Sequence, residues 1–323
     1  MNTYNNKTRI ILILDILKNE TDDDHPMKAD ELLRRIKAEG LKCDRKTLYN
    51  DISSLSDAGY DINRDPSGGY KLSSRDFEDA ELRLLADAVY SSKFISQKKT
   101  HVLIRKLAKL TSSHLASSMT RQIYSSDSKT PNEDVLYNVD TLSRAIYGNV
   151  QVCFEYLVWG TNKKLITKGE KKRKLSPWAL IWQDQNYYLM AYDSGAGKMK
   201  HFRVDKMRHV ELTADEREGG KEFEKIDMSS YVEETFSMYG GRQETITLDM
   251  PASMIGIAYD RFGTDLFQRP GSEGRVLVRA KCYVSSQFYG WLSGLGGEIL
   301  LAGPESVVDE YRDYLKKLLK KYK

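Results

Sequence analysis

One stretch of the chain, from Asp44 to Gly59, carries polar side chains at a spacing that suits recognition of another molecule. Leu48, Ile52 and Leu55 recur at i, i+4 and i+7, which predicts a helix with a single apolar stripe. The opposite face and its flanks carry Arg45, Lys46, Thr47, Tyr49 and Asn50. Cationic, hydroxyl and amide groups of this kind contact phosphates and base edges in nucleic acids. The stretch is therefore a candidate recognition helix.

Neighbouring segments would position this helix. Asp44 can accept backbone N–H bonds as an N-cap, and Gly59 can supply the left-handed residue that ends a helix. An apolar helix over 7–18 and an amphipathic helix near 28–38 precede it, and a hairpin over 61–72 follows. Arg64 and Lys71 would project from that hairpin. The predicted order is helix, helix, recognition helix and wing.

This order resembles the winged helix-turn-helix domains of DeoR-like bacterial transcription factors. The resemblance implies that the third helix enters the major groove of a double-stranded DNA operator. The residues that it places against DNA are Arg45, Lys46, Thr47, Tyr49 and Asn50, with Arg64 and Lys71 on the wing. The alternative is a small helical domain for protein contacts, in which these side chains are only solvated. Residues 1–75 hold 13 basic and 13 acidic side chains, so it is the order of elements, and not net charge, that favours DNA.

A second group of polar side chains lies after residue 136. Strand alternation over 185–193 separates Tyr188 from Tyr187, and Tyr188 is the hydroxyl expected on an open face. The residues expected to join it are Lys174, Ser176, His201 and Arg203. Such cations and hydroxyls bind phosphate or nucleotide oxygens, and Arg203 would hold a phosphate through two hydrogen bonds. His201 would make this binding depend on pH near the ordinary imidazole titration range.

Five short segments rich in β-branched and aromatic residues predict a small barrel around this group: VQVCFEY, KKRKLSPWALIW, QNYYLMAYD, KMKHFRV and MRHVEL. The run SPWALIW, the triplet YYL at 187–189 and the run HFRVDK at 201–206 resemble the WYL domain, an Sm/SH3-like barrel, over about 136–215. Tyr187 stands where that family has Trp, and Lys206 where Arg is common. The resemblance implies a ligand surface for a small anionic or nucleic-acid-derived effector. The alternative is that these aromatic residues are core.

The whole chain is expected to be a multidomain α+β protein. Its expected parts are a winged helix-turn-helix domain over 1–75, a helical linker or dimerisation segment over 76–135, a ligand-sensing WYL barrel over 136–218, an acidic linker over 219–243 and an α+β domain over 244–323. The last part resembles the C-terminal extension that often follows WYL domains. These parts together predict a ligand-responsive, DNA-binding transcriptional regulator.

The segment over 76–135 has three further features. Apolar stripes over 82–89 and 102–110 need burial, and one recognition helix reads only a few base pairs, so a homodimer is expected. Ser112 to Pro131 is polar and is expected to form a loop. From Ala88 to Ser126 the chain holds seven basic residues and no acidic one.

Composition and motifs limit the other classes of function. With 40% hydrophobic and 30% charged residues, no long apolar run and no signal peptide, the chain is expected to be cytoplasmic. Its three cysteines are far apart, which indicates neither a disulfide framework nor a metal site. Neither HExxH, nor a P-loop, nor GxSxG occurs, so no enzyme and no cofactor are expected. An Sm-like RNA-binding or assembly module stays open as an alternative, as does, more remotely, a bifunctional winged-helix enzyme.

Overall fold

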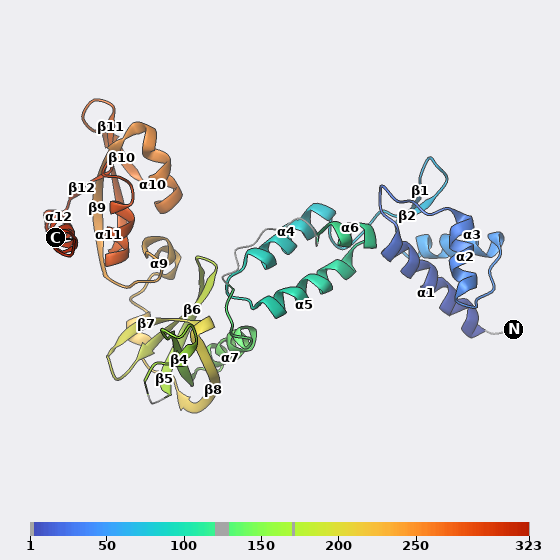
Figure 1. Ribbon diagram of the computed structural model, residues 1–323, viewed down its shortest axis with the longest axis horizontal. Helices are drawn as coiled ribbons and strands as arrows, with labels where there is room; N and C mark the ends of the chain where they lie inside the picture. Colours follow the sequence, from blue (N-terminus) through green and yellow to red (C-terminus); the bar gives the residue numbers. More distant parts are fainter. Residues whose placement is uncertain (1–2, 120–128, 170–171, 323) are drawn as a thin grey trace. The chain divides into compact units, whose positions relative to one another are not determined.

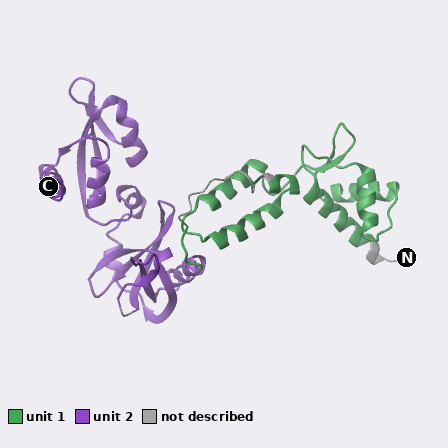
Figure 2. Ribbon diagram, in the orientation of Figure 1, with its two compact units in different colours: residues 1–133 green, residues 134–323 purple. Residues whose placement is uncertain are grey.

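The computed structural model describes residues 3–119, 129–169 and 172–322 of a mixed α/β protein (Figure 1). The chain divides into two compact units, residues 1–133 and residues 134–323, drawn green and purple in Figure 2. Helices dominate the first unit, and two antiparallel sheets form the centre of the second. Across the described residues, no helix is long and apolar enough to cross a membrane.

Unit 1 begins with three helices and a hairpin over residues 3–75, which we call the head. Its elements are α1 (Thr3–Glu20), α2 (Ala29–Ala38), α3 (Arg45–Asp57), β1 (Ile62–Arg64) and β2 (Tyr70–Leu72). Leu17, Leu32 and Leu48, one from each helix, are fully buried in one cluster that Leu72 of the hairpin joins. The predicted order of elements is confirmed. However, α1 is not buried all round, because Ile11 is 62% exposed.

The hairpin is tied to the rest of the head by a third short pairing. Met27, in the segment before α2, exchanges two backbone hydrogen bonds with Tyr70 of β2, at N···O distances of 2.8 and 2.7 Å. Gly68 turns the chain between β1 and β2 with a φ of +85°, a conformation in which glycine alone is unstrained. The wing is therefore a fixed part of the head.

The rest of unit 1 is a helical segment whose apolar faces meet each other. It contains α4 (Asp79–Ser91), α5 (Gln97–Leu107), a 3₁₀ turn (Ala108–Leu110) and α6 (Ser113–Met119). Leu82 and Ala86 of α4 are buried in one cluster with Ile104 of α5 and Leu115 of α6. Most of the two apolar stripes is therefore buried within one chain, although Leu85 stays 38% exposed. The predicted loop over 112–131 is wrong where α6 forms, and residues 120–128 lie outside the described part.

Unit 2 begins with a helix and a curled antiparallel sheet. The elements are α7 (Val135–Tyr147), β3 (Val150–Trp159), β4 (Leu165–Thr167), β5 (Arg173–Gln183), β6 (Asn186–Asp193), β7 (Lys198–Arg203) and β8 (Met207–Glu216). The strand order is β4-β3-β5-β6-β7, and β8 pairs with β3. Among the described residues no pairing joins β7 to β8, so the sheet is a half-barrel and not the closed barrel of five strands that the sequence predicts.

The long strand β5 makes the sheet curl. Its first residues, 173–175, pair with β3, whereas its second half pairs with β6. A register shift falls between Pro177 and Ala179, and proline lacks the backbone N–H that a regular ladder needs. The bend at Pro177 therefore lets β6 and β7 turn away from β3 and form one wall of a concave surface.

The rest of unit 2 consists of helices and a second antiparallel sheet. Its elements are α8 (Gly220–Phe223), α9 (Met228–Glu234), β9 (Arg242–Pro251), α10 (Ile255–Phe262), β10 (Phe267–Pro270), β11 (Arg275–Val284), α11 (Ser286–Ser293), β12 (Leu300–Gly303) and α12 (Glu305–Lys320), and the sheet order is β10-β11-β9-β12. Residues 219–243 are not the simple linker that the sequence predicts. Tyr231 and Met238 are buried in one cluster with Tyr188 and Met190 of β6, so this segment covers the half-barrel.

Candidate functional sites

The exposed face of α3 is held in place by its cap and its buried stripe. The side chain of Asp44 accepts a hydrogen bond from the Thr47 backbone N–H at 2.7 Å, and that bond lowers the pKa of the carboxyl. Leu48 and the other stripe residues are buried, whereas Lys46 and Asn50 are exposed. The helix therefore presents a cation and an amide to solvent from a rigid support.

Two of the expected DNA contacts are already engaged by carboxylates. Arg45 donates to Asp30 at 2.6 Å, and Lys71 lies 2.7 Å from Asp23. Tyr49 is 41% exposed, and its ring lies beside that of Tyr70 of the wing, with centroids 6.4 Å apart. Among the described residues no ion pair engages Lys46 or Arg64. The unneutralised charge of the predicted DNA face thus lies on those two side chains.

A buried ion pair that the sequence analysis does not predict fastens α3 to α1. The Arg9 guanidinium donates to both carboxylate oxygens of Asp51, at 2.6 and 3.2 Å, and each side chain is 9% exposed. The hydrogen bond to Asp51 raises the pKa of Arg9. Asp51 stands three residues after Leu48 on the stripe side of the helix, and an acid at that position was the available clue.

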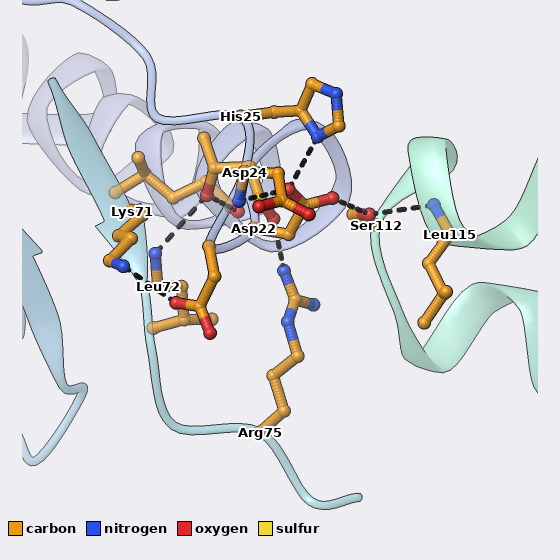
Figure 3. A network of polar contacts seen from close by, with 11 residues as sticks. Asp22, Asp24, His25, Lys71, Leu72, Arg75, Ser112 and Leu115 are labelled. Carbon is orange, nitrogen blue, oxygen red and sulfur yellow. Dashed lines mark hydrogen bonds and ion pairs between the residues drawn. The ribbon is translucent and has the colours of Figure 1, made fainter. Parts of the chain in front are cut away.

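A polar joint connects the head to the helical segment within unit 1. Figure 3 shows Asp22 between His25 and Ser112. The Ser112 hydroxyl donates to Asp22 at 2.5 Å and accepts from the Leu115 backbone N–H at 3.1 Å, while His25 Nδ1 lies 2.6 Å from the same carboxylate. Burial acts against the charge of Asp22, but these hydrogen bonds outweigh it and lower its pKa. Arg75 closes the joint by donating to two backbone carbonyls at the end of α1.

In unit 2, a cavity of about 1090 Å³ is lined by the half-barrel on one side and by residues 226–241 on the other. Tyr188 of β6 and both His201 and Arg203 of β7 line it, so the structure brings three of the five predicted ligand residues together. Tyr231 and Met238 line the opposite wall. Tyrosine rings and the Arg203 guanidinium therefore face one cavity.

Arg203 is organised by neighbours within the chain. Its Nε and Nη2 donate to the two oxygens of Asp205 at 2.9 and 3.0 Å, and Nη2 also donates to Asn186 Oδ1 at 2.7 Å. Burial acts against the charge, but the hydrogen bond and charge of Asp205 outweigh it and raise the pKa of Arg203. The side of the guanidinium that would grip a phosphate through two bonds is thus occupied by Asp205, which corrects the predicted geometry.

His201 is half-buried and contacts the covering segment. Its Nε2 lies 3.1 Å from the Tyr231 hydroxyl, and the two rings stack with centroids 5.6 Å apart. Burial lowers the pKa of His201 to about 4 and raises that of Tyr231 to about 12. With this pKa the imidazole is neutral at pH 7 and titrates below the ordinary range that the sequence analysis expects.

Tyr188 lines the cavity but does not lie on an open face. It is 8% exposed and packs against Tyr231 and Met238, and burial raises the pKa of its hydroxyl. Strand alternation predicts correctly that Tyr188 and Met190 share a face. It cannot predict that a segment more than 30 residues later covers that face.

Lys174 and Ser176 do not belong to this cavity. Lys174 lies 2.8 Å from Asp215, and Ser176, 2% exposed, accepts a hydrogen bond from the Glu218 backbone N–H at 2.8 Å. Both residues stand in the half of β5 before the bend. The sequence places them on a strand next to β6 but does not reveal where that strand turns.

The sequence analysis also misses several residues that build the cavity. Asn186 and Asp205 position the Arg203 side chain, and the Tyr156 hydroxyl accepts a hydrogen bond from the Arg203 backbone N–H at 3.3 Å. Asp205 stands inside the HFRVDK run that carries the family resemblance, so an acid two residues after the arginine was a usable clue. Tyr231 lies in the segment that reads as an acidic linker, where periodicity gives no indication.

The family comparison covers the half-barrel. Residues 137–212 match the family model described as WYL domain. The chain contains a WYL domain. Tyr188, His201 and Arg203 lie inside the matched range, whereas Tyr231 and Met238 lie beyond it. The cavity is therefore formed jointly by the WYL domain and by the segment that follows it.

Solved structures show more distant similarity. The chain is similar to proteasome accessory factor B/C (PafBC) of Arthrobacter aurescens, with 16% identity and a TM-score of 0.29 over 98% of this chain and 48% of that one. It thus spans about half the length of PafBC. It is also similar to a CRISPR Cas-related protein, with 12% identity and a TM-score of 0.35 over 76% of this chain and 72% of that one. No curated protein matches the chain.

Proposed function

We propose that this protein is a ligand-responsive transcriptional regulator, which binds double-stranded DNA through the head and an effector through the cavity beside the WYL domain. The observation that carries the proposal is the exposed polar face of α3. It is capped by Asp44, fastened to α1 through Asp51 and flanked by a two-stranded wing. A helix fixed in this way can hold side chains against base edges in the major groove.

The side chains of the head take different roles in this proposal. Lys46 and Asn50 contact base edges, Thr47 and Tyr49 flank them, and Arg64 contacts a phosphate from the wing. To bind phosphate, Arg45 must give up its ion pair with Asp30, and Lys71 must give up its ion pair with Asp23. Their net contribution is smaller because one ion pair replaces another.

The DNA contacts proposed for the head are tested by measuring how the full chain binds duplexes that cover the DNA around its own gene. Lys46→Ala/Asn50→Ala should lose discrimination between the preferred duplex and random DNA, by about 1–3 kcal/mol for each good base contact. Arg64→Ala should weaken all duplexes alike. The matched control is Lys7→Ala/Asn19→Ala at two exposed positions of α1, which should leave discrimination unchanged. Unchanged discrimination in the α3 variant would contradict the proposal, and RNA binding without duplex preference would instead support an Sm-like module.

The proposed effector is a small anionic molecule, such as a nucleic-acid fragment or nucleotide. Lys198 and Lys200 line the cavity with Arg203, and Tyr156, Tyr188, Tyr231, Tyr239 and Tyr283 offer rings on which a base can stack. Calorimetric titration of the full chain with short single-stranded DNA, RNA and dinucleotides tests this. Lys198→Gln should weaken binding without disturbing the fold, because Lys198 is exposed. Absence of binding across the panel would count against the sensor role, and turnover of a nucleotide would favour an enzyme.

We further propose that the protein acts as a homodimer. Since α4 and α5 bury most of their apolar faces against each other, the support comes from recognition: one α3 reads only a few base pairs, and two copies read a pseudo-palindromic site. Light scattering at micromolar concentration, with and without a preferred duplex, should give twice the chain mass of 37.1 kDa. A mass of one chain under both conditions would contradict the dimer.

A further inference from the structure

The outward face of α5 carries a row of exposed cations that the proposed roles do not use. Lys98 and Arg105 are seven residues apart, so at about 100° per residue they lie within about 20° of each other around the helix axis. Lys109, in the 3₁₀ turn that directly follows α5, continues the row one turn later, and Lys106 lies at its flank. At about 1.5 Å per residue the row from Lys98 to Lys109 spans roughly 16 Å.

This row is not neutralised by the chain. Across the described parts of unit 1, no ion pair engages Lys98, Arg105, Lys106 or Lys109, and Arg105 Nε only donates to a carbonyl of its own helix at 3.3 Å. In the head, several cations are neutralised instead, although among the described residues Lys46 and Arg64 are not. Its Arg9, Arg35, Arg45 and Lys71 are all paired with carboxylates. Lys98, Arg105, Lys106 and Lys109 therefore form a compact row of cations without a carboxylate partner in the described part of unit 1.

The head alone lacks the net positive charge that is common in a DNA-binding module. Residues 1–75 carry equal numbers of acidic and basic side chains, and Lys46 and Arg64 are the predicted contacts without a carboxylate partner among the described residues. Affinity for duplex DNA depends on cations that displace counterions from phosphates. α5 belongs to the same compact unit, and the Asp22–Ser112 joint of Figure 3 fastens the α6 that follows it to the head.

We propose that the outward face of α5 is a second DNA-contacting surface, which binds backbone phosphates of the duplex beside the segment that α3 reads; this rests on the proposed function of the head. The row is about as long as five base pairs at 3.4 Å each. α5 exposes none of the large apolar or aromatic side chains that anchor a protein interface, so phosphate suits this face better than a protein partner.

The test measures how the affinity of the full chain for a labelled 30-base-pair duplex of mixed sequence depends on salt. Lys98→Gln/Arg105→Gln/Lys109→Gln should flatten the slope of log K against log salt by up to about 2.7, from about 0.9 per phosphate contact. The matched control is Lys316→Gln/Lys317→Gln/Lys320→Gln on the exposed side of α12, which removes the same formal charge. It should keep the wild-type slope.

A second comparison locates the contact. Shortening the duplex to about 12 base pairs should lower the affinity of the wild type and leave the α5 variant nearly unchanged, because the flanking phosphates are then absent. A wild-type salt slope in the α5 variant, or an equal flattening of the slope in the α12 control, would overturn this inference. The proposed DNA contacts of the head would be unaffected by either result. No duplex binding by the wild type at about 50 mM salt would overturn the proposed function and this inference with it.

Discussion

Replacing Asp51 by Ala should destabilise the head much more than loss of an exposed carboxylate would. The reason is the partner left behind: Arg9 would keep its charge in a site where its side chain is 9% exposed, without the two hydrogen bonds that Asp51 accepts. The Asn6 amide oxygen would still accept from Arg9 Nη1 at 3.0 Å. Breaking a buried ion pair by removing one partner costs about 3–5 kcal/mol.

This cost has a measurable consequence for α3. It corresponds to an opening equilibrium about 200- to 5000-fold larger, at 1.36 kcal/mol per factor of ten. Hydrogen–deuterium exchange of the full chain, followed in peptides from α3, measures that opening without requiring the head to be isolated. We expect α3 amides to exchange faster by a factor in this range, while peptides from unit 2 keep their wild-type rates.

Two further variants separate the charge from the loss of a side chain. Asp57→Ala, at an exposed position of the same helix, should change exchange by less than about threefold, as surface substitutions usually do. Arg9→Met/Asp51→Leu removes both charges and should recover most of the protection, since apolar replacements of a buried pair are often neutral. Near-wild-type exchange in Asp51→Ala, or a double variant as unprotected as the single one, would refute the reasoning.

Two other predictions concern unit 2. Because burial lowers the pKa of His201 to about 4 from an ordinary 6.5, its contribution to stability is complete above about 6.5 and is lost as pH falls toward 4. An NMR titration of the ring should therefore show a midpoint near 4, and a midpoint near 6.5 would contradict the buried geometry. Gly219→Ala should lower the melting temperature by several degrees, since Gly219 has a φ of +85° and a Cβ there would overlap the Tyr192 ring. Gly256→Ala in α10, where a Cβ meets nothing within 4 Å, should leave the melting temperature equal or slightly higher.

Local features of the sequence predicted the head well. The Asp44 cap, the stripe of α3 and the glycine turn of the wing each depend on residues a few positions apart, and the structure shows all three. The helical stripes over 82–89 and 102–110 were also recognisable. Their partner was not, because periodicity shows that a face needs burial but not whether it is buried within the chain or against another copy.

Long-range packing explains what the sequence could not predict in the cavity. Alternation placed Tyr188 on the correct side of β6, but the exposure of that side depends on Tyr231 and Met238, far away in the chain. Likewise, the bend at Pro177 separates Ser176 from the cavity, although Ser176 lies on β5, the strand next to β6. The chemistry of Arg203 depends on Asp205, whose carboxylate the motif contained but whose direction only the fold sets.

The wall contributed by residues 226–241 decides how this protein can be cut for ligand screening. A fragment that stops where the family match ends, at residue 212, would keep Tyr188 and Arg203 but lose Tyr231 and Met238. Met190, which is fully buried in the intact chain, would then face water beside Ile181. An exposed apolar patch of this kind promotes self-association. Compounds selected on that fragment would report on a surface with one wall, whereas the two-walled cavity exists only when the chain continues through residues 226–241.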